Sequence, residues 1–180
     1  MASMMNNEGF ILANELDGIR CERLKYNIEK QGANIVEVIN KRGEKIGEKY
    51  KEQFDKVLLD APCSGEGRFL GTNVGTYRNW STKTVKELAK LQKKLLKSAY
   101  QALKPDGIMV YSTCTLNKKE NEEVLQWAIE NLNVKLLDVD IDLKEKMQGF
   151  TEGLDKRISK AIRILPSKNM EGFFVAKLRK

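Results

Sequence analysis

Hydrophobic and polar positions along the chain follow two different periods. Short apolar runs, rich in β-branched or aromatic residues, predict strands at residues 9–15, 35–39, 54–60, 108–112, 134–139 and 172–178. Apolar residues at helical spacing predict helices at residues 17–30, 84–103 and 117–132. Because strands and helices alternate, the sequence predicts an α/β fold with a doubly wound sheet.

Polar residues mark where these elements begin and end. Asp17 is placed to cap the helix over residues 17–30, and Gly32 ends it. Asn117 followed by Glu120 has the spacing of a helix start. These signals predict the first helix and the helix that follows residues 108–112 from local chemistry alone.

Three further segments are interpreted by their composition. Residues 54–60 are predicted to form a strand that is buried on both faces, as in a parallel sheet. Residues 104–107, Lys-Pro-Asp-Gly, predict a turn. Residues 140–169 show neither period and are predicted to be largely loop.

Length, charge and hydropathy narrow the class of protein. The 180 residues, of which 41% are hydrophobic, predict one domain over residues 1–180. The formal net charge of +7 favours an acidic partner such as nucleic acid. Much of the lysine falls at residues 83–97, where a solvated helix face is the simpler interpretation. No apolar run has the length of a membrane span and no signal-peptide pattern is present, which predicts a soluble, cytoplasmic protein.

The amino-acid inventory excludes several kinds of chemistry. The chain has no histidine, which excludes Ser-His-Asp and Cys-His catalysis. Cys21, Cys63 and Cys114 are odd in number and lack metal-ligand spacing, so we expect neither a disulfide scaffold nor a metal site. Catalysis is therefore expected to depend on cysteine, carboxylate, lysine or tyrosine.

Polar residues directly follow three of the predicted strands. Ligands bind at the carboxyl ends of strands in an open parallel sheet, so these positions are candidates for a site. Glu15 follows the first strand and is either a holder of a ribose hydroxyl or a solvated loop acid. Asp60-Ala61-Pro62-Cys63 begins at the last residue of the predicted strand 54–60, and Ser112-Thr113-Cys114 begins at the last residue of the predicted strand 108–112.

The two strand-end cysteines predict covalent chemistry when they are taken together. A free cysteine is usually a small buried hydrophobe, which is the preferred interpretation of Cys21. Cys63 and Cys114 end neighbouring buried strands, and Pro62 and the following glycines let the chain turn sharply beside a ligand. A cysteine phosphatase is disfavoured because Cys63 precedes Arg68 by one residue too few.

These motifs resemble the Sun/Fmu family of RNA (cytosine-5)-methyltransferases, which use S-adenosylmethionine. The resemblance is carried by residues 9–15, 59–67, 103–107, 111–115, 120–122 and 172–176. The end of the chain, around residues 163–166 and 172–174, is similar to members that act on bacterial ribosomal RNA. The resemblance implies a Rossmann-like methyltransferase sheet, mostly parallel, with an antiparallel C-terminal strand.

The resemblance also implies a role for each candidate site residue. Cys114 is the implied nucleophile, which adds to carbon 6 of a cytosine so that carbon 5 can accept the methyl group. Asp60 hydrogen-bonds the cytosine ring edge, and Cys63 assists loss of the carbon 5 proton and release of the enzyme. On the cofactor side, the implied residues are Glu15, Asp60 and Pro62, with Glu15 on the ribose of S-adenosylmethionine.

The family's glycine-rich cofactor loop and the strand before it are not found ahead of residue 9. We therefore expect the chain to lack the family's N-terminal part, including the first strand of the sheet. Two hypotheses stay open: an RNA methyltransferase, or a catalytically silent RNA-binding remnant of one. A small-molecule methyltransferase is disfavoured because it rarely needs two cysteines. Ribosomal RNA is the first choice of partner and transfer RNA the second.

Overall fold

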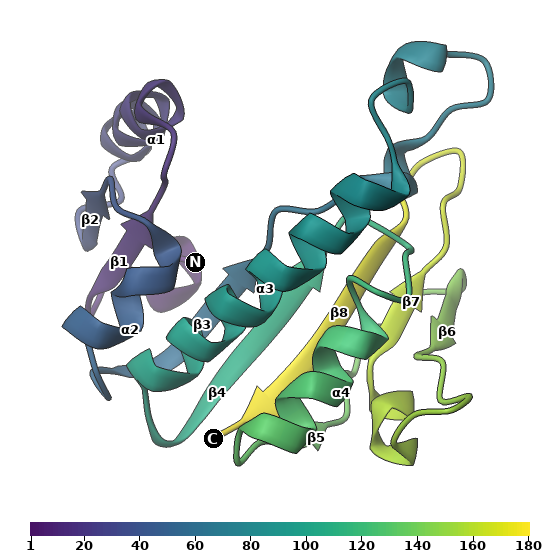
Figure 1. Ribbon diagram of the computed structural model, residues 1–180. Helices are drawn as coiled ribbons and strands as arrows, with labels where there is room; N and C mark the ends of the chain where they lie inside the picture. The colour runs from purple at the N-terminus through teal and green to yellow at the C-terminus, as the bar shows by residue number, and fades with distance from the viewer. The chain divides into compact units, whose positions relative to one another are not determined.

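The computed structural model describes residues 1–180, which form two compact units, Met1–Ile46 and Gly47–Lys180. Figure 1 shows the elements of both units, and each unit is described by itself. No helix in the structure combines the length and the apolar character that a membrane crossing requires.

The N-terminal unit is a small β-α-β arrangement. Its elements are η1 (Ser3–Met5), β1 (Ile11–Asn14), α1 (Gly18–Lys30), β2 (Val36–Ile39) and η2 (Gly43–Lys45). β1 and β2 pair in parallel and form a two-stranded sheet. The predicted cap is confirmed, because the Asp17 carboxylate accepts a hydrogen bond from the Arg20 backbone N–H at 2.8 Å. Cys21 is buried, as expected for a structural cysteine.

The C-terminal unit is a six-stranded mixed sheet with helices. Its strands are β3 (Phe54–Asp60), β4 (Leu103–Thr113), β5 (Lys135–Leu137), β6 (Lys146–Gln148), β7 (Ile162–Ile164) and β8 (Phe173–Arg179). Its helices are α2 (Ile46–Lys49, which begins at the unit boundary), η3 (Glu66–Arg68), η4 (Val74–Thr76), α3 (Thr82–Ala102), α4 (Glu122–Asn131) and η5 (Lys156–Lys160). The strand order is β3-β4-β8-β7-β6, and β5 also pairs with β8.

Strand pairing confirms the α/β prediction and the antiparallel C-terminal strand. β3 and β4 pair in parallel, with α3 as the crossover between them, and β8 runs antiparallel to β4. β7 pairs with the first half of β8 and β5 with the second half. The predicted turn at residues 104–107 interrupts the β3-β4 register, and Asp106 takes a positive φ of 62° there.

Two predictions about local structure were wrong, and one was incomplete. Residues 140–169 are largely loop as predicted, but they also contain the paired strands β6 and β7, which are too short for a detectable period. α4 begins at Glu122 rather than near Asn117, because the buried Glu120 side chain makes contacts with distant residues instead of capping a helix. β3 is not buried on both faces: it is an edge strand of its sheet, and Leu58 is 51% exposed.

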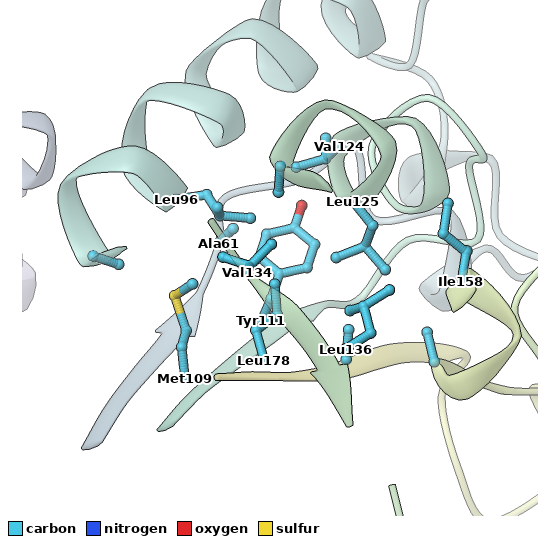
Figure 2. Close-up of a cluster of buried hydrophobic side chains, with 14 of the residues drawn as sticks. Ala61, Leu96, Met109, Tyr111, Val124, Leu125, Val134, Leu136, Ile158 and Leu178 are labelled. Atoms are coloured by element: carbon cyan, nitrogen blue, oxygen red, sulfur yellow. The ribbon is translucent and has the colours of Figure 1, made fainter. Parts of the chain in front are cut away.

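The hydrophobic core lies between the sheet of the C-terminal unit and the helices α3 and α4. Figure 2 shows Leu96 of α3 and Leu125 of α4 close to the ring of Tyr111, which projects from β4. Tyr111 also contacts Phe174 of β8 edge to face, with 6.4 Å between ring centroids. This packing fixes the ends of β3 and β4, where both strand-end cysteines are found.

Candidate active site

The two cysteine motifs lie side by side because β3 and β4 are parallel neighbours. Asp60 is in register with Ser112, and the Ala61 backbone N–H donates a hydrogen bond to the Ser112 carbonyl at 2.9 Å. The chain leaves both strands at the same edge of the sheet. As a result, the Sγ atoms of Cys63 and Cys114, 51 residues apart in sequence, are 3.2 Å from each other.

The surroundings of Cys63 strongly change the pKa of its thiol. Burial, together with the hydrogen bond and charge of Cys114, raises the pKa of Cys63 to about 12. Two sulfur atoms at 3.2 Å do not both ionise readily, since like charges at that distance repel. Cys63 therefore stays a neutral thiol near neutral pH, and its S–H can be donated to the sulfur of Cys114.

Asp60 is exposed at the end of β3, in contrast to the half-buried cysteines. One of its carboxylate oxygens accepts a hydrogen bond from the Ser112 hydroxyl at 3.1 Å. A carboxylate has about four acceptor positions, so Asp60 keeps capacity for donors of a ligand. Pro62 is held by its carbonyl, which accepts a hydrogen bond from the Gln92 side chain at 2.8 Å.

A buried carboxylate, Glu120, connects the two cysteine loops. Its Oε1 accepts the Ser64 backbone N–H at 3.0 Å, and its Oε2 accepts the Ser64 hydroxyl at 2.5 Å. The Ser64 hydroxyl also lies 2.9 Å from the Thr115 hydroxyl. Ser64 and Thr115 directly follow Cys63 and Cys114, so this network holds both cysteine loops in one arrangement.

Two core residues hold Glu120 in place from the other side. Gln92 of α3 donates to Glu120 Oε1 at 2.9 Å, and the Tyr111 hydroxyl donates to the Glu120 carbonyl at 2.6 Å. Burial is the main cause that raises the pKa of Glu120, while the hydrogen bonds from Ser64 and Gln92 oppose it. Burial also raises the pKa of Tyr111 well above its ordinary value, and the charge of Glu120 adds to this.

The two glycines of the Cys63 loop have different functions. Gly65 takes the left-handed conformation, with φ of 73°, which agrees with the predicted sharp turn. Gly67 allows two backbones to approach: a Cβ there would lie 2.0 Å from the Gly172 carbonyl oxygen and 2.9 Å from that of Cys114. Its N–H donates to the Cys114 carbonyl at 3.0 Å. Only a residue without a side chain fits at this contact between three segments.

A buried ion pair supports the segment after Cys114. Arg163 of β7 contacts Glu122 with two hydrogen bonds of 2.6 Å, and both side chains are at most 4% exposed. The third contact of the guanidinium is to the Leu116 carbonyl at 2.8 Å. Arg163 therefore fixes the backbone two residues beyond Cys114, from a strand that the hydrophobic pattern did not predict.

Of the predicted site residues, the structure brings Asp60, Pro62, Cys63 and Cys114 together. Glu15 belongs to the N-terminal unit, where it follows β1. Its Oε1 accepts the Asp17 backbone N–H at 2.9 Å, and its Oε2 pairs with Arg20 at 3.0 Å. No group of three or more Cys, Asp or Glu side chains is placed to hold a metal ion.

Sequence interpretation missed Glu120 and Gln92 as parts of this site. Glu120 had been interpreted as a helix-start signal. Gln92 did give a local signal, because it lies seven residues after Val85 and four before Leu96, on the buried face of α3. A polar residue at such a position requires a hydrogen-bond partner, and here the partners are the Pro62 carbonyl and Glu120.

The model of the family described as 16S rRNA methyltransferase RsmB/F matches residues 1–179. The chain belongs to this family. The predicted resemblance is thereby confirmed, and the RsmB/F assignment covers both compact units.

Curated relatives agree with the RsmB/F assignment. The chain is 40% identical over 188 residues to ribosomal RNA small subunit methyltransferase F of Cronobacter sakazakii, and 40% identical over 183 residues to that of Vibrio vulnificus. In both cases the match covers 100% of this chain and 37% of the relative. The chain thus spans little more than a third of the length of these relatives.

Solved structures show the same fold. A methyltransferase homologue from Pyrococcus horikoshii is 36% identical with a TM-score of 0.83, and the match covers 99% of this chain and 56% of that one. NSun6 from Pyrococcus horikoshii, solved with SFG, is 30% identical with a TM-score of 0.82, over 99% of this chain and 43% of that one. The RsmB/F chain therefore has the Rossmann-like methyltransferase fold that its motifs predicted.

Proposed function

We propose that this chain carries the catalytic part of an enzyme that transfers a methyl group from S-adenosylmethionine to carbon 5 of a cytosine in RNA, with ribosomal RNA as the first choice. The observation that carries the proposal is the pair of sulfur atoms 3.2 Å apart beside Asp60. Membership of the RsmB/F family supports it. In this proposal both compact units belong to one methyltransferase domain.

Cys114 is the proposed nucleophile. Carbon 5 of cytosine is too electron-poor to attack a sulfonium methyl group, so it needs activation. The thiolate of Cys114 forms a bond to carbon 6, and the ring electrons then make carbon 5 a nucleophile. Extruding a base from a duplex costs a few kcal/mol, which favours an unpaired cytosine as the target.

Asp60 and Cys63 have proposed roles in the later steps. Asp60 hydrogen-bonds the ring edge and stabilises the adduct as charge moves onto the ring. Cys63 assists loss of the carbon 5 proton and breakage of the bond between Cys114 and carbon 6. Its raised pKa supports the second of these roles, because a neutral thiol 3.2 Å away donates a hydrogen bond to the departing Cys114 sulfur.

The residues present fit a cofactor that offers amine and hydroxyl donors. Asp60 accepts one hydrogen bond from the protein and is exposed, and Glu15 has a carboxylate at the end of β1. When bound, S-adenosylmethionine supplies an electrophilic methyl group on its sulfonium. We propose that Asp60 and Pro62 contact this cofactor. Within the N-terminal unit, taken by itself, Glu15 stays the residue predicted to hold ribose hydroxyls.

Trapping of the covalent adduct tests the assignment of roles. We expect Cys63→Ser, in a version of the protein that also contains the family's N-terminal part, to accumulate a protein–RNA adduct on a denaturing gel when it is incubated with S-adenosylmethionine and a labelled RNA that contains unpaired cytosines. Cys114→Ser and the double variant should give no adduct, since the attacking sulfur is absent. An adduct that forms only in Cys114→Ser would reverse the two roles.

The same experiment separates the enzyme from a silent RNA-binding protein, the second candidate, which the net charge of +7 favours. Filter binding of the same RNA to the same variants provides the second measurement. RNA binding without an adduct in any variant would support the silent protein and remove the catalytic proposal. Comparison of ribosomal RNA and transfer RNA fragments then identifies the preferred class of RNA.

A further inference from the structure

All lysines of α3 lie on one side of the helix. They are Lys83, Lys86, Lys90, Lys93, Lys94 and Lys97. At 3.6 residues per turn, these positions fall within an arc of about 100° around the helix axis. The buried face, represented by Val85, Gln92 and Leu96, is centred about 130° away from them. The lysines therefore form a continuous strip, here called the lysine face, that points away from the core.

The side chains of the lysine face form no ion pair within the protein, and Glu87, at the edge of the face, is the one acid of the same helix. None of its six side chains makes an ion pair or hydrogen bond, whereas Lys25, Lys104 and Lys160 elsewhere in the chain are each paired with a carboxylate. Glu87 is the only acid in α3, so the helix has a net charge of +5 out of +7 for the whole chain.

The charge pattern of the strip also differs from that of an ordinary solvent-exposed helix face. Lysines three and four residues apart repel each other, and this repulsion destabilises a helix. A solvent-exposed face normally mixes charges of both signs, as α1 does with Glu22, Lys25 and Glu29. An unpaired strip of one sign is a surface suited to an anionic partner.

Along the axis of α3, the lysine face passes the level of the Cys63 loop, because Lys90, Lys93 and Lys94 are within two residues of Gln92. Gln92, on the opposite side of the same helix, contacts the Pro62 carbonyl, one residue before Cys63. With a rise of 1.5 Å per residue, Lys83 lies about 14 Å along the axis from that contact. In Figure 1 the N-terminal end of α3 extends beyond the arrowheads of β3 and β4, at the edge where the cysteine motifs end these strands.

We propose that the lysine face binds the sugar–phosphate backbone of the RNA strand that leads to the cysteine pair. This rests on the proposed function, and it names the part of the RNA that this helix contacts. From Lys83 to Lys97 the strip is about 21 Å long, which spans several nucleotides of a single strand. Lysine ammonium groups bind phosphates without reading sequence, so this surface positions the RNA and does not select the cytosine.

The test replaces Lys83, Lys86 and Lys90, the N-terminal half of the strip, with glutamine. Binding of a short single-stranded RNA is measured at several salt concentrations. For single strands each lost phosphate contact lowers the slope of log K against log salt by about 0.7, so we expect the slope to fall by about 2. The affinity in about 0.1 M salt should fall by roughly 10- to 100-fold.

Two matched variants control for net charge and for folding. Replacement of Lys51, Lys135 and Lys144, which are exposed and make no ion pair, removes the same charge from other parts of the same unit. We expect this control to change the affinity less than threefold. Replacement of the three α3 lysines with arginine keeps the charge and should retain the affinity of the wild type.

Equal losses of affinity in the two glutamine variants, or no loss in either, would overturn the proposal. So would a lysine-face variant that keeps RNA affinity but loses binding to anionic phospholipid vesicles, because that identifies a membrane surface as the partner. The binding measurement does not need methyl transfer. If the Cys114-dependent adduct forms but the lysine-face variant binds RNA normally, only the proposal for the lysine face is wrong. If the lysine-face variant binds RNA weakly but no adduct forms in the cysteine variants, only the proposed catalytic function is wrong.

Discussion

The two compact units differ in how much of their own sequence they bury. Cys21 is the only buried hydrophobic residue of Met1–Ile46, whereas Gly47–Lys180 contains all the others, most of them in the core cluster that includes Tyr111. Hydrophobic residues therefore form a buried core in the C-terminal unit but remain mostly accessible to solvent in the N-terminal unit. The cysteine pair is supported by the unit with the core, which provides the rigid frame that a covalent site requires.

The largest expected effect comes from comparing one ion pair in each unit. Arg163→Met should destabilise the protein by about 3–5 kcal/mol, because it leaves the Glu122 carboxylate buried without its partner. Arg20→Met breaks the pair with Glu15, in which the arginine is 72% exposed, and should cost less than about 1 kcal/mol. Urea unfolding of both variants measures the difference.

Similar losses in the two arginine variants would contradict the comparison of the units. Retained activity in Arg163→Met, with a normal yield of the covalent adduct, would further show that the Leu116 contact does not position Cys114. The solvent-screened pair between Arg157 and Asp155 gives a second control within the C-terminal unit, and its loss should change the stability far less than the loss of the Arg163–Glu122 pair.

The sequence predicted the parts of the site that depend on local motifs. Cys63 and Cys114 could be placed together because each follows a strand, and strands of a parallel pair end at the same edge of a sheet. The Asp17 cap was predictable for a similar reason, since it involves only three residues of separation. Edge exposure of β3 was not predictable, because it depends on which strands are its neighbours.

The supporting contacts could not be predicted because they join residues that are distant in sequence. Glu122 and Arg163 are 41 residues apart, and Gln92 and Glu120 are 28 apart. No local period or motif predicts such a pairing, because the two side chains of each pair come into contact only when the core forms. The strand that carries Arg163 has three residues, which is too few for an alternating pattern to be recognised.

A second comparison uses one substitution with opposite expected signs. Gly67→Ala should destabilise by about 1–3 kcal/mol, because a Cβ there overlaps the carbonyl oxygens of Gly172 and Cys114. Gly18→Ala, at the first position of α1 with open space around it, should stabilise α1 by about 0.4–1 kcal/mol. Thermal unfolding and amide hydrogen exchange of α1 measure the two effects. A destabilised Gly18→Ala would show that the N-terminal unit is more tightly packed than its burial indicates.

The smallest expected effect is a pH dependence that arises in the C-terminal unit. Because burial raises the pKa of Glu120 above its ordinary value of 4.5, the folded state binds this proton more tightly than the unfolded state does. The stability that protonated Glu120 contributes is fully present below pH 4.5 and is lost as the pH rises through the raised pKa. Glu120→Gln does not titrate, and its amide can still bond with Ser64 and Gln92.

The stability of Glu120→Gln relative to the wild type should therefore increase as the pH rises above 4.5 and level off above the raised pKa of Glu120. Urea unfolding of both proteins between about pH 4 and 8 measures this difference, and all other carboxyl groups cancel in it. A difference that falls with pH would mean that the hydrogen bonds from Ser64 and Gln92 outweigh burial. In that case Glu120 would be a stabilising anion at neutral pH, and the network around the cysteine pair would depend on its charge.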